Sequence, residues 1–414
     1  MKIAVIGGGA AGMIAAYYLD KKHAVTVFEK HPILGGNIRT LNKNVHEGTE
    51  KIPNDLYIDN GVIEFDERNF VQFHALMVEL GVEMEPVLLT TGYFAGNGRH
   101  YLSPYRIFQA ESDWGTRIAE MSKLGFCVFD FASFMLRTAS RSDAYYEGKR
   151  IDEFFRDHVY YRWLKMLLMY AYSIPYSQVD AMPAVLGIPV LRRCALFTRW
   201  TRIKNGVYTY IEKILERFKG SVHLNAHIAG IKRTANGVAV SASSGESFDF
   251  DKVVFATPPD QVLKLLSDPT GDEIRYFKTW RGNVAHTLIH TDSSIYDPYR
   301  VRSYSAFDVF EKGGNDAGYN GFLNPLIGLG ELSPVRYNLA FNLDDRIHPG
   351  CVLHTQRHDT PLYTVEAFEY RSRVIEENGR NNTYHAGAYL FDGLHEGAVR
   401  SAQAVARLLD CPVG

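Results

Sequence analysis

The sequence is poor in cysteine, has no long apolar run and carries almost no net charge. Its cysteines, Cys127, Cys194, Cys351 and Cys411, lie far apart and form no CxxC pair, so they indicate neither a disulfide framework nor a zinc site. No stretch reaches the roughly 18 apolar residues of a membrane-spanning helix. The net charge of −2 gives no general attraction for nucleic acid. We therefore predict no metal site, no nucleic-acid partner and no spanning helix.

Two features bear on location. The first predicted strand begins at Ile3, so we expect no signal peptide and a cytoplasmic protein. The apolar stretch 124–136, bounded by Lys123 and Arg137, is too short to span a bilayer. We expect it to form a helix that packs into the core, because apolar helices usually do. The alternative is an apolar lip that admits a lipid and makes peripheral contact with the inner face of a membrane.

What the sequence does contain is a glycine-rich turn between two short apolar runs. Gly7, Gly9 and Gly12 follow the first run, and the second run, 24–28, ends in the acidic residue Glu29. This is the pattern of a strand, helix and strand that bind a dinucleotide. The glycines permit the tight turn, a close approach to the pyrophosphate and close helix packing. The acid is expected to accept the ribose hydroxyls.

Two further segments favour flavin adenine dinucleotide (FAD) over a nicotinamide cofactor. A second glycine turn, 35–40, follows directly and includes an arginine suited to a pyrophosphate. Near the C-terminus, a short strand at 384–388 precedes a helix that opens at Gly397 and Ala398. The amides and the positive dipole end of such a helix suit an anion or an electron-rich ring edge.

These segments resemble those of the flavin amine oxidase and protoporphyrinogen oxidase superfamily over the whole chain. Within it, the chain is most similar to a bacterial branch often encoded beside cyclopropane fatty acid synthases. That likeness rests on the motifs 66–70, 290–292, Tyr363 and 391–396. The resemblance implies an α/β fold, in which a Rossmann-like FAD-binding domain carries an inserted α+β substrate domain with an antiparallel sheet and a helical cap. It also implies that the segment 59–63 passes the flavin ring, and that Ile228, in a strand pair over 222–231, contacts the adenine through its backbone.

Length and patterning agree with two domains. A chain of 414 residues, 46% of them hydrophobic, is too long for one core. We assign the FAD-binding domain to 1–88, 205–270 and 376–414, and the substrate domain to 89–204 and 271–375. The residues predicted to bind the cofactor are Gly7, Gly9, Ala10, Ala11, Gly12, Glu29, Lys30, Gly36, Asn37, Arg39, Thr40, Gly61, Val62, Ile63, Ile228, Ala256, Thr257, Gly387, Glu396, Gly397, Ala398 and Ser401.

Two histidines are candidate catalytic residues. In the resembling amine oxidases a lysine lies beside the flavin, and the matching strand here places His286 at that position, which argues against ordinary amine oxidation. His395 immediately precedes the C-terminal cofactor helix and has a side chain suited to proton transfer near neutral pH. The alternative role for His395 is to satisfy backbone groups at the helix start. Tyr363 and Tyr389 are either substrate contacts or core aromatics, and the resemblance implies that an aromatic ring from the stretch holding Tyr389 and Phe391 lies beside the flavin.

We expect an FAD-dependent oxidoreductase that oxidises or dehydrogenates an apolar, lipid- or fatty-acid-like small molecule by hydride transfer. No second glycine motif follows an apolar strand, so electrons should come from the substrate rather than from NAD(P)H. The alternatives are a flavin amine oxidase, a non-oxidative flavin isomerase or mutase, and a flavoprotein subunit of a lipid-modifying complex. The sequence leaves the electron acceptor and the oligomeric state open.

Overall fold

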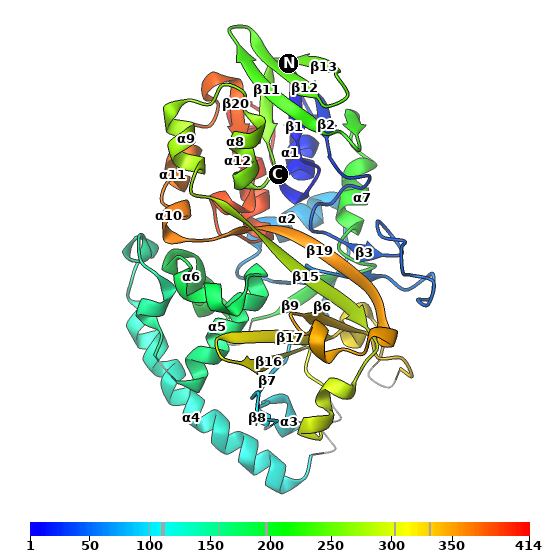
Figure 1. The fold of residues 1–414 in the computed structure, drawn as a ribbon, viewed down its shortest axis with the longest axis vertical. Helices are drawn as coiled ribbons and strands as arrows, with labels where there is room; N and C mark the ends of the chain where they lie inside the picture. The colour runs from blue at the N-terminus through cyan, green and yellow to red at the C-terminus, as the bar shows by residue number, and fades with distance from the viewer. Residues whose placement is uncertain (99, 109–111, 157, 195–197, 302–303, 331–332) are drawn as a thin grey trace.

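The computed structural model describes residues 1–98, 100–108, 112–156, 158–194, 198–301, 304–330 and 333–414. Figure 1 shows an elongated molecule with both chain ends in its upper part. The long helix α4 (Trp114–Ala139) runs along the lower left edge. Two long strands, β15 (Arg281–His290) and β19 (Val352–Leu362), cross the middle and connect the upper and lower parts.

A parallel five-stranded sheet forms the upper part. Its strands, in order, are β10 (Ser221–His223), β2 (Ala24–Phe28), β1 (Lys2–Ile6), β14 (Lys252–Phe255) and β20 (Thr383–His385). Parallel sheets are normally covered on both faces, which explains the continuous apolar runs of β1 and β14. The helices that pack together beside this sheet are α1 (Ala10–Leu19), α2 (Val71–Leu80), α7 (Thr209–Leu215) and α12 (His395–Leu408).

Smaller elements extend this part. An antiparallel sheet of β11 (Ile228–Thr234), β12 (Gly237–Ala242) and β13 (Ser247–Phe250) lies at the top of Figure 1. The segment 222–231, predicted to be a strand pair, is therefore divided between two sheets, since β10 belongs to the parallel one. The remaining elements are the strand pair β3 (Thr40–Leu41) and β4 (Ile58–Asp59), and the helices α8 (Pro259–Leu265), α9 (Gly271–Phe277), α10 (Val365–Phe368) and α11 (Arg371–Glu376).

A seven-stranded sheet dominates the lower part. Its order is β19, β15, β18 (Asn338–Phe341), β17 (Asp316–Phe322), β16 (Phe307–Gly313), β7 (Thr91–Phe94) and β8 (His100–Leu102). All neighbouring pairs are antiparallel except β16 with β7. A third antiparallel sheet, β5 (Glu64–Asp66), β9 (Trp200–Ile203) and β6 (Met84–Val87), lies between the two parts in Figure 1.

Helices α3 (Tyr105–Phe108), α4, α5 (Val159–Tyr172) and α6 (Ala184–Cys194) complete the lower part. The stretch 124–136 is helical as predicted, but only one side of α4 packs into the core. Cys127 and Phe134 are buried, whereas Trp114, Phe129 and Leu136 are 76%, 75% and 79% exposed. Among the residues described, no helix is both long and apolar enough to cross a membrane.

The predicted fold class is confirmed: a parallel sheet of the dinucleotide-binding type is combined with antiparallel sheets and helices. The parallel sheet draws on strands from four distant stretches of the chain, and the seven-stranded sheet on strands between 91 and 362. The division into two domains at the residues named above stays a prediction. The three cysteines whose side chains the structure describes are free.

Candidate functional site

The first glycine turn joins β1 to α1. Gly7 has a φ of +107°, which favours glycine. A Cβ on Gly12 would lie 1.9 Å from the Gly7 oxygen, so a side chain there would separate helix and strand. Gly9 is the N-cap of α1, and no side chain caps the helix. The first helical turn, which Ala10 and Ala11 begin, therefore presents its amides to an anion.

The second glycine turn lies directly against the first. The Gly35 amide donates to the Gly8 carbonyl at 2.8 Å. A Cβ on Gly36, which has a φ of +59°, would lie 2.9 Å from the Gly9 Cα. The two turns thus form one surface of bare backbone beside the start of α1, where an anionic ligand can approach closely.

Arg39 supplies a buried positive charge near these turns. Its side chain is 7% exposed, and it donates to the Ile38 carbonyl at 2.9 Å. Among the residues that the structure describes, it forms no ion pair, and burial lowers its pKa. A buried guanidinium without a carboxylate partner is costly unless an anion is bound.

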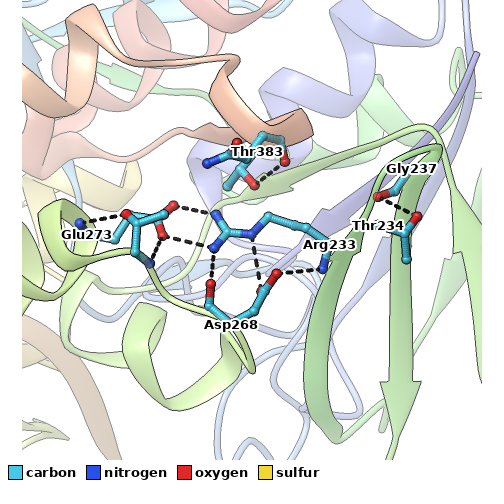
Figure 2. Close-up of polar contacts among 8 residues, drawn as sticks. Arg233, Thr234, Gly237, Asp268, Glu273 and Thr383 are labelled. Atoms are coloured by element: carbon cyan, nitrogen blue, oxygen red, sulfur yellow. Dashed lines mark hydrogen bonds and ion pairs between the residues drawn. The ribbon is translucent and has the colours of Figure 1, made fainter.

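Arg233 provides the contrasting case of a buried arginine with full pairing (Figure 2). Its guanidinium contacts Asp268 at 3.2 Å and Glu273 at 2.5 Å. Glu273 also accepts a hydrogen bond from the amide of Thr270 at the start of α9. Arg233 is therefore satisfied within the protein, whereas Arg39 is not.

Glu29 lies at the end of β2, beside the first turn. Its side chain is buried, and its two oxygens accept hydrogen bonds from the amides of Gly8 at 2.8 Å and His31 at 2.9 Å. The Glu29 carbonyl accepts from the amide of Ala226, which brings the chain entering β11 at Ile228 to the same place. The acid and the predicted adenine contact are therefore neighbours, as a ribose and its base would require.

Three other predicted cofactor residues have partners within the protein. Lys30 lies 3.8 Å from Asp359, and the Asn37 amide donates to the Asp359 carbonyl at 3.0 Å. The Thr40 hydroxyl donates to Asp59, whose pKa burial raises to about 7. These contacts connect the residues 30–40 to β19 and β4. They hold this segment in place through its side chains, so its backbone groups can still bind a ligand.

The strand β14 ends beside the first turn. The amide of Ala256 donates to the Ile6 carbonyl at 2.9 Å, and a Cβ on Gly7 would lie 2.7 Å from the Ala256 oxygen. The hydroxyl of Thr257 is buried and has no hydrogen-bond partner among the described residues. Buried polar groups are usually satisfied, so this hydroxyl is available to a ligand.

The segment 59–63, predicted to pass the flavin ring, contacts β15 and β19. A Cβ on Gly61, with a φ of +130°, would lie 3.0 Å from the His358 ring. Thr287 donates to the Asn60 side-chain oxygen and contacts the His358 ring nitrogen at 2.9 Å. The Asn60 side-chain nitrogen is buried without a described partner. Burial lowers the pKa of His358 to about 4, so this histidine is neutral at pH 7.

Asn60, Thr287 and His358 were not among the predicted site residues. His286, which was, is exposed and lies on the opposite face of β15 from Thr287, because side chains alternate along a strand. The structure thus brings Thr287 rather than His286 to the segment 59–63. Apolar and polar residues do not alternate along β15, so its sequence carries no signal for which of the two faces that segment.

The C-terminal segment is fixed by its own side chains. Gly387 donates to the Ser401 hydroxyl at 2.9 Å, and that hydroxyl donates to the Ala398 carbonyl at 2.9 Å. Asp392 accepts from the amides of Leu394 and Gly397, at 2.9 and 2.8 Å. Asp392 therefore satisfies backbone groups at the start of α12, a role that the sequence analysis considered for His395.

His395, the first residue of α12, packs among aromatic side chains. Its Nε2 lies 3.2 Å from the Tyr210 hydroxyl, and its ring contacts Phe65 and Phe73 edge-on at 5.7 and 5.5 Å between centroids. Burial lowers its pKa to about 4. The neutral ring packs against aromatic side chains and has one polar contact, and both roles considered for His395 stay predictions.

Glu396, a predicted cofactor residue, accepts hydrogen bonds from the start of helix α2. Its two oxygens accept hydrogen bonds from the amides of Gln72 at 3.0 Å and Phe73 at 2.9 Å, in the first turn of α2. No side chain of α2 itself caps that helix. Glu396 thus joins the start of α12 to the start of α2.

A row of buried aromatic rings lies immediately before α12. Tyr389 contacts Trp280 at 5.5 Å, Trp280 contacts Tyr363 at 5.9 Å, and Tyr363 contacts Tyr172 at 5.7 Å between centroids. The Tyr389 hydroxyl is buried and lacks a partner among the described residues. Phe391 is half-buried beneath Arg400. We call Tyr172, Trp280, Tyr363 and Tyr389 the aromatic row.

Comparison with known proteins assigns the chain to a family. A family model described as flavin containing amine oxidoreductase matches residues 10–287, well over half of the chain. The chain belongs to this family. No curated protein matches the sequence of this flavin oxidoreductase.

Solved structures resemble this flavin oxidoreductase along its full length. Cyclohexylamine oxidase from Brevibacterium oxydans superposes with a TM-score of 0.68 at 13% identity, covering 99% of both chains. Putrescine oxidase bound to putrescine gives 0.67 at 13% identity, also over 99% of both chains. A CLA-producing fatty acid isomerase from P. acnes gives 0.64 at 17% identity, covering 99% of this chain and 97% of that one. At these identities the likeness establishes the fold.

The predicted cofactor is FAD, and the family assignment confirms it: the chain is an FAD-dependent oxidoreductase. The residues present fit the cofactor. The bare glycine turns suit a pyrophosphate, and among the described residues the buried Arg39 forms no ion pair. The buried Thr257 hydroxyl and the Asn60 side-chain nitrogen have no hydrogen-bond partner in the described part of the chain. When bound, FAD accepts a hydride equivalent from the substrate, while the protein provides orientation and electrostatics.

Proposed function

We propose that this flavin oxidoreductase oxidises or dehydrogenates a largely apolar, lipid- or fatty-acid-like substrate by hydride transfer to FAD. The observation that carries the proposal is the aromatic row, four buried rings in contact with one another that reach the segment preceding α12 at Tyr389. Such rings offer a large apolar surface with few polar tips. The unpartnered Tyr389 hydroxyl is the polar group available there to a substrate.

The amine oxidase alternative is supported by the family name and by the likeness to two amine oxidase structures. Against it stands the sequence of β15, which contains no lysine. Thr287 lies where that strand meets Asn60 in the segment 59–63, and a threonine hydroxyl is not an ammonium group.

The cofactor roles belong to the same proposal. We assign the pyrophosphate to the two glycine turns with Arg39, the ribose to Glu29, and the adenine to the backbone at Ile228. Support comes from the open start of α1 and from the short distance between Glu29 and the chain entering β11.

The proposal includes peripheral contact of α4 with the inner face of an anionic membrane. Trp114 and Phe129 extend from this helix into solvent, and aromatic rings favour the membrane interface. The same helix carries the basic residues Arg117 and Arg137. Its acids face other partners, Glu120 pairing with Lys123 and Asp130 with His158, so the helix suits anionic headgroups.

The test is an anaerobic absorbance scan of the flavin-loaded protein against mono-unsaturated phospholipids, cyclopropane phospholipids, simple amines and NADPH. Bleaching of the flavin by a lipid supports the proposal. Bleaching by amines alone overturns it in favour of an amine oxidase. If none of these compounds bleaches the flavin, the oxidative assignment of a lipid substrate fails, and an isomerase or a partner-dependent subunit takes its place.

A further inference from the structure

Glu64 is a buried acid immediately after the segment 59–63, which we predict to pass the flavin ring. Val62 is half-buried and Ile63 is buried, and the chain then enters β5 at Glu64, whose side chain is 8% exposed. One carboxyl oxygen accepts a hydrogen bond from the Tyr170 hydroxyl. The other oxygen is buried and has no hydrogen-bond partner in the part of the chain that the structure describes. Such an oxygen is costly to bury unless something else binds it.

The surroundings of this carboxyl are aromatic. The Tyr170 ring, on α5, contacts Phe307 at 4.3 Å and Tyr319 at 5.0 Å between centroids, on β16 and β17. Glu64 therefore extends from the cofactor segment into the junction with the seven-stranded sheet. This is where a substrate between the flavin and that sheet would lie.

Few charged groups act on Glu64. Asp59 on β4 is the nearest acid that opposes its ionisation, and Tyr319 on β17 and Tyr170 on α5 are the other titratable neighbours. Arg202 pairs with Glu64 across the β5 and β9 backbones, but its guanidinium forms an ion pair with Glu85. No described cation compensates the Glu64 charge.

The protein contains a second tyrosine and glutamate pair that shows what a purely structural pair looks like. Tyr93 donates to Glu311, whose other oxygen is 3.4 Å from the Gly96 amide. Arg162 lies 3.9 Å from the same carboxyl. Both oxygens of Glu311 have protein partners, whereas Glu64 keeps one oxygen open.

We propose that Glu64 is the acid–base residue of the substrate site, and that Tyr170 is the positioning residue that fixes its orientation. This rests on the proposed function. Two C–H bonds of the substrate break, beside a double bond or carbonyl group that activates them. One hydrogen leaves as a proton to the open Glu64 oxygen, and its electron pair becomes the new C=C bond. The other leaves as hydride, with flavin as the oxidant, and the Glu64 proton passes later to water.

The electrostatics of the site agree with this role. Burial raises the pKa of Glu64 to about 7, so the carboxyl changes its protonation state near neutral pH. A base of that pKa is suited to accept a proton in turnover. The Tyr170 pKa is raised well above its ordinary value by burial, so the phenol remains a hydrogen-bond donor to the carboxylate.

The first test does not depend on turnover. Infrared difference spectra of the flavin-loaded protein, labelled with ¹³C-carboxyl glutamate, are recorded from pH 5 to 9 for the parent, Glu64→Gln, Tyr170→Phe and Glu311→Gln. We expect a protonated carboxyl band that disappears as pH rises through about 7. It should be absent in Glu64→Gln, shifted in midpoint in Tyr170→Phe and retained in Glu311→Gln. A parent spectrum without such a titration, or one that Glu64→Gln retains, overturns the proposal.

The second test measures flavin reduction by mono-unsaturated phosphatidylglycerol vesicles. Glu64→Gln should keep its flavin and be reduced about a hundredfold or more slowly. Tyr170→Phe should show a shifted pH profile, and Glu311→Gln should match the parent. Unchanged reduction of Glu64→Gln contradicts the assignment. If the parent itself is not bleached, the lipid substrate is wrong, while the infrared titration still decides whether Glu64 ionises in the site.

Discussion

Gly36 lies so close to Gly9 that a Cβ added to Gly36 would be 2.9 Å from the Gly9 Cα. The contact joins two turns that are 27 residues apart in sequence and places their bare backbones at the start of α1. Because no side chain separates them, the space beside the helix start remains open to a pyrophosphate.

Gly36→Ala should therefore lose most of its bound flavin while remaining folded. The new methyl group separates the turns, and the φ of +59° adds strain of about 1–2 kcal/mol. The measurement is the ratio of flavin to protein absorbance after purification. Gly313→Ala is the matched control, since its φ is +97° but its Cβ meets nothing within 4 Å. Equal flavin content in Gly36→Ala and the parent would show that the two glycine turns do not bind the pyrophosphate.

Arg39→Met should weaken FAD binding without destabilising the apoprotein. A charge-assisted hydrogen bond to a ligand contributes about 1.5–3 kcal/mol, so the dissociation constant should rise roughly tenfold to a hundredfold. The apoprotein should be equally or more stable, because an uncompensated buried charge is removed. Flavin fluorescence titration and urea unfolding of the apoprotein check both parts. A destabilised apoprotein would mean that Arg39 has a structural partner.

Arg233→Met should destabilise the protein without weakening FAD binding. Its guanidinium, on a side chain only 6% exposed, is paired with Asp268 and Glu273 (Figure 2). Removing one partner of a buried network costs about 3–5 kcal/mol. Urea unfolding should detect that loss, while the folded variant should bind FAD as the parent does. Weakened FAD binding by folded Arg233→Met would contradict this separation of roles.

Acid should destabilise the protein through its buried histidines. Burial lowers the pKa of both His358 and His385 to about 4, whereas an unfolded histidine has a pKa near 6.5. Between these values the unfolded chain binds more protons, so the free energy of unfolding falls as pH decreases from about 6.5 to 4. At pH 5 each of these histidines should lower the free energy of unfolding by about 2 kcal/mol. Urea unfolding at pH 7 and 5 measures the difference.

The control for this prediction is His46, which is exposed. His46→Gln should show the same loss of stability between pH 7 and 5 as the parent, whereas His385→Gln should lose less. If His385→Gln and the parent have the same pH dependence, the buried histidine is not responsible.

Polar substitutions on α4 should weaken membrane binding. Trp114→Ser with Phe129→Ser removes two large exposed apolar side chains from one helix. Sedimentation with phosphatidylglycerol vesicles should show reduced binding of this double variant. Val78→Ser, at a position on α2 that is 82% exposed, is the control and should bind as the parent does. If the double variant instead loses the ability to form a dimer, and the parent does not bind vesicles, the exposed face of α4 contacts a second copy of the chain.

The parts of the site that the sequence predicted well are local in sequence. The glycine turn, the acid after the second strand and the C-terminal helix follow from spacing within short segments, because turn geometry and helix starts depend on neighbouring residues. Glu29 and Gly36 accordingly lie near the first turn in the structure.

The parts that were missed depend on contacts between distant segments. Thr287 and His358 meet Asn60 only through the pairing of β15 with β19, and a shift of one residue would have turned His286 inward instead. The roles of His395 were inferred from its position at a helix start, but its neighbours Phe65 and Phe73 come from β5 and α2. Glu64 was passed over, although an acid that directly follows the apolar residues Val62 and Ile63 of a predicted cofactor segment is a visible signal.

The most direct test of the account is a single anaerobic turnover with a mono-unsaturated phospholipid, followed by mass spectrometry of the lipid. The account predicts that flavin bleaching accompanies the loss of two hydrogen atoms from one acyl chain, with one lipid converted per flavin. A lipid of unchanged mass with a moved double bond would instead indicate an isomerase. An unaltered lipid, together with bleaching by amines, would contradict the central claim.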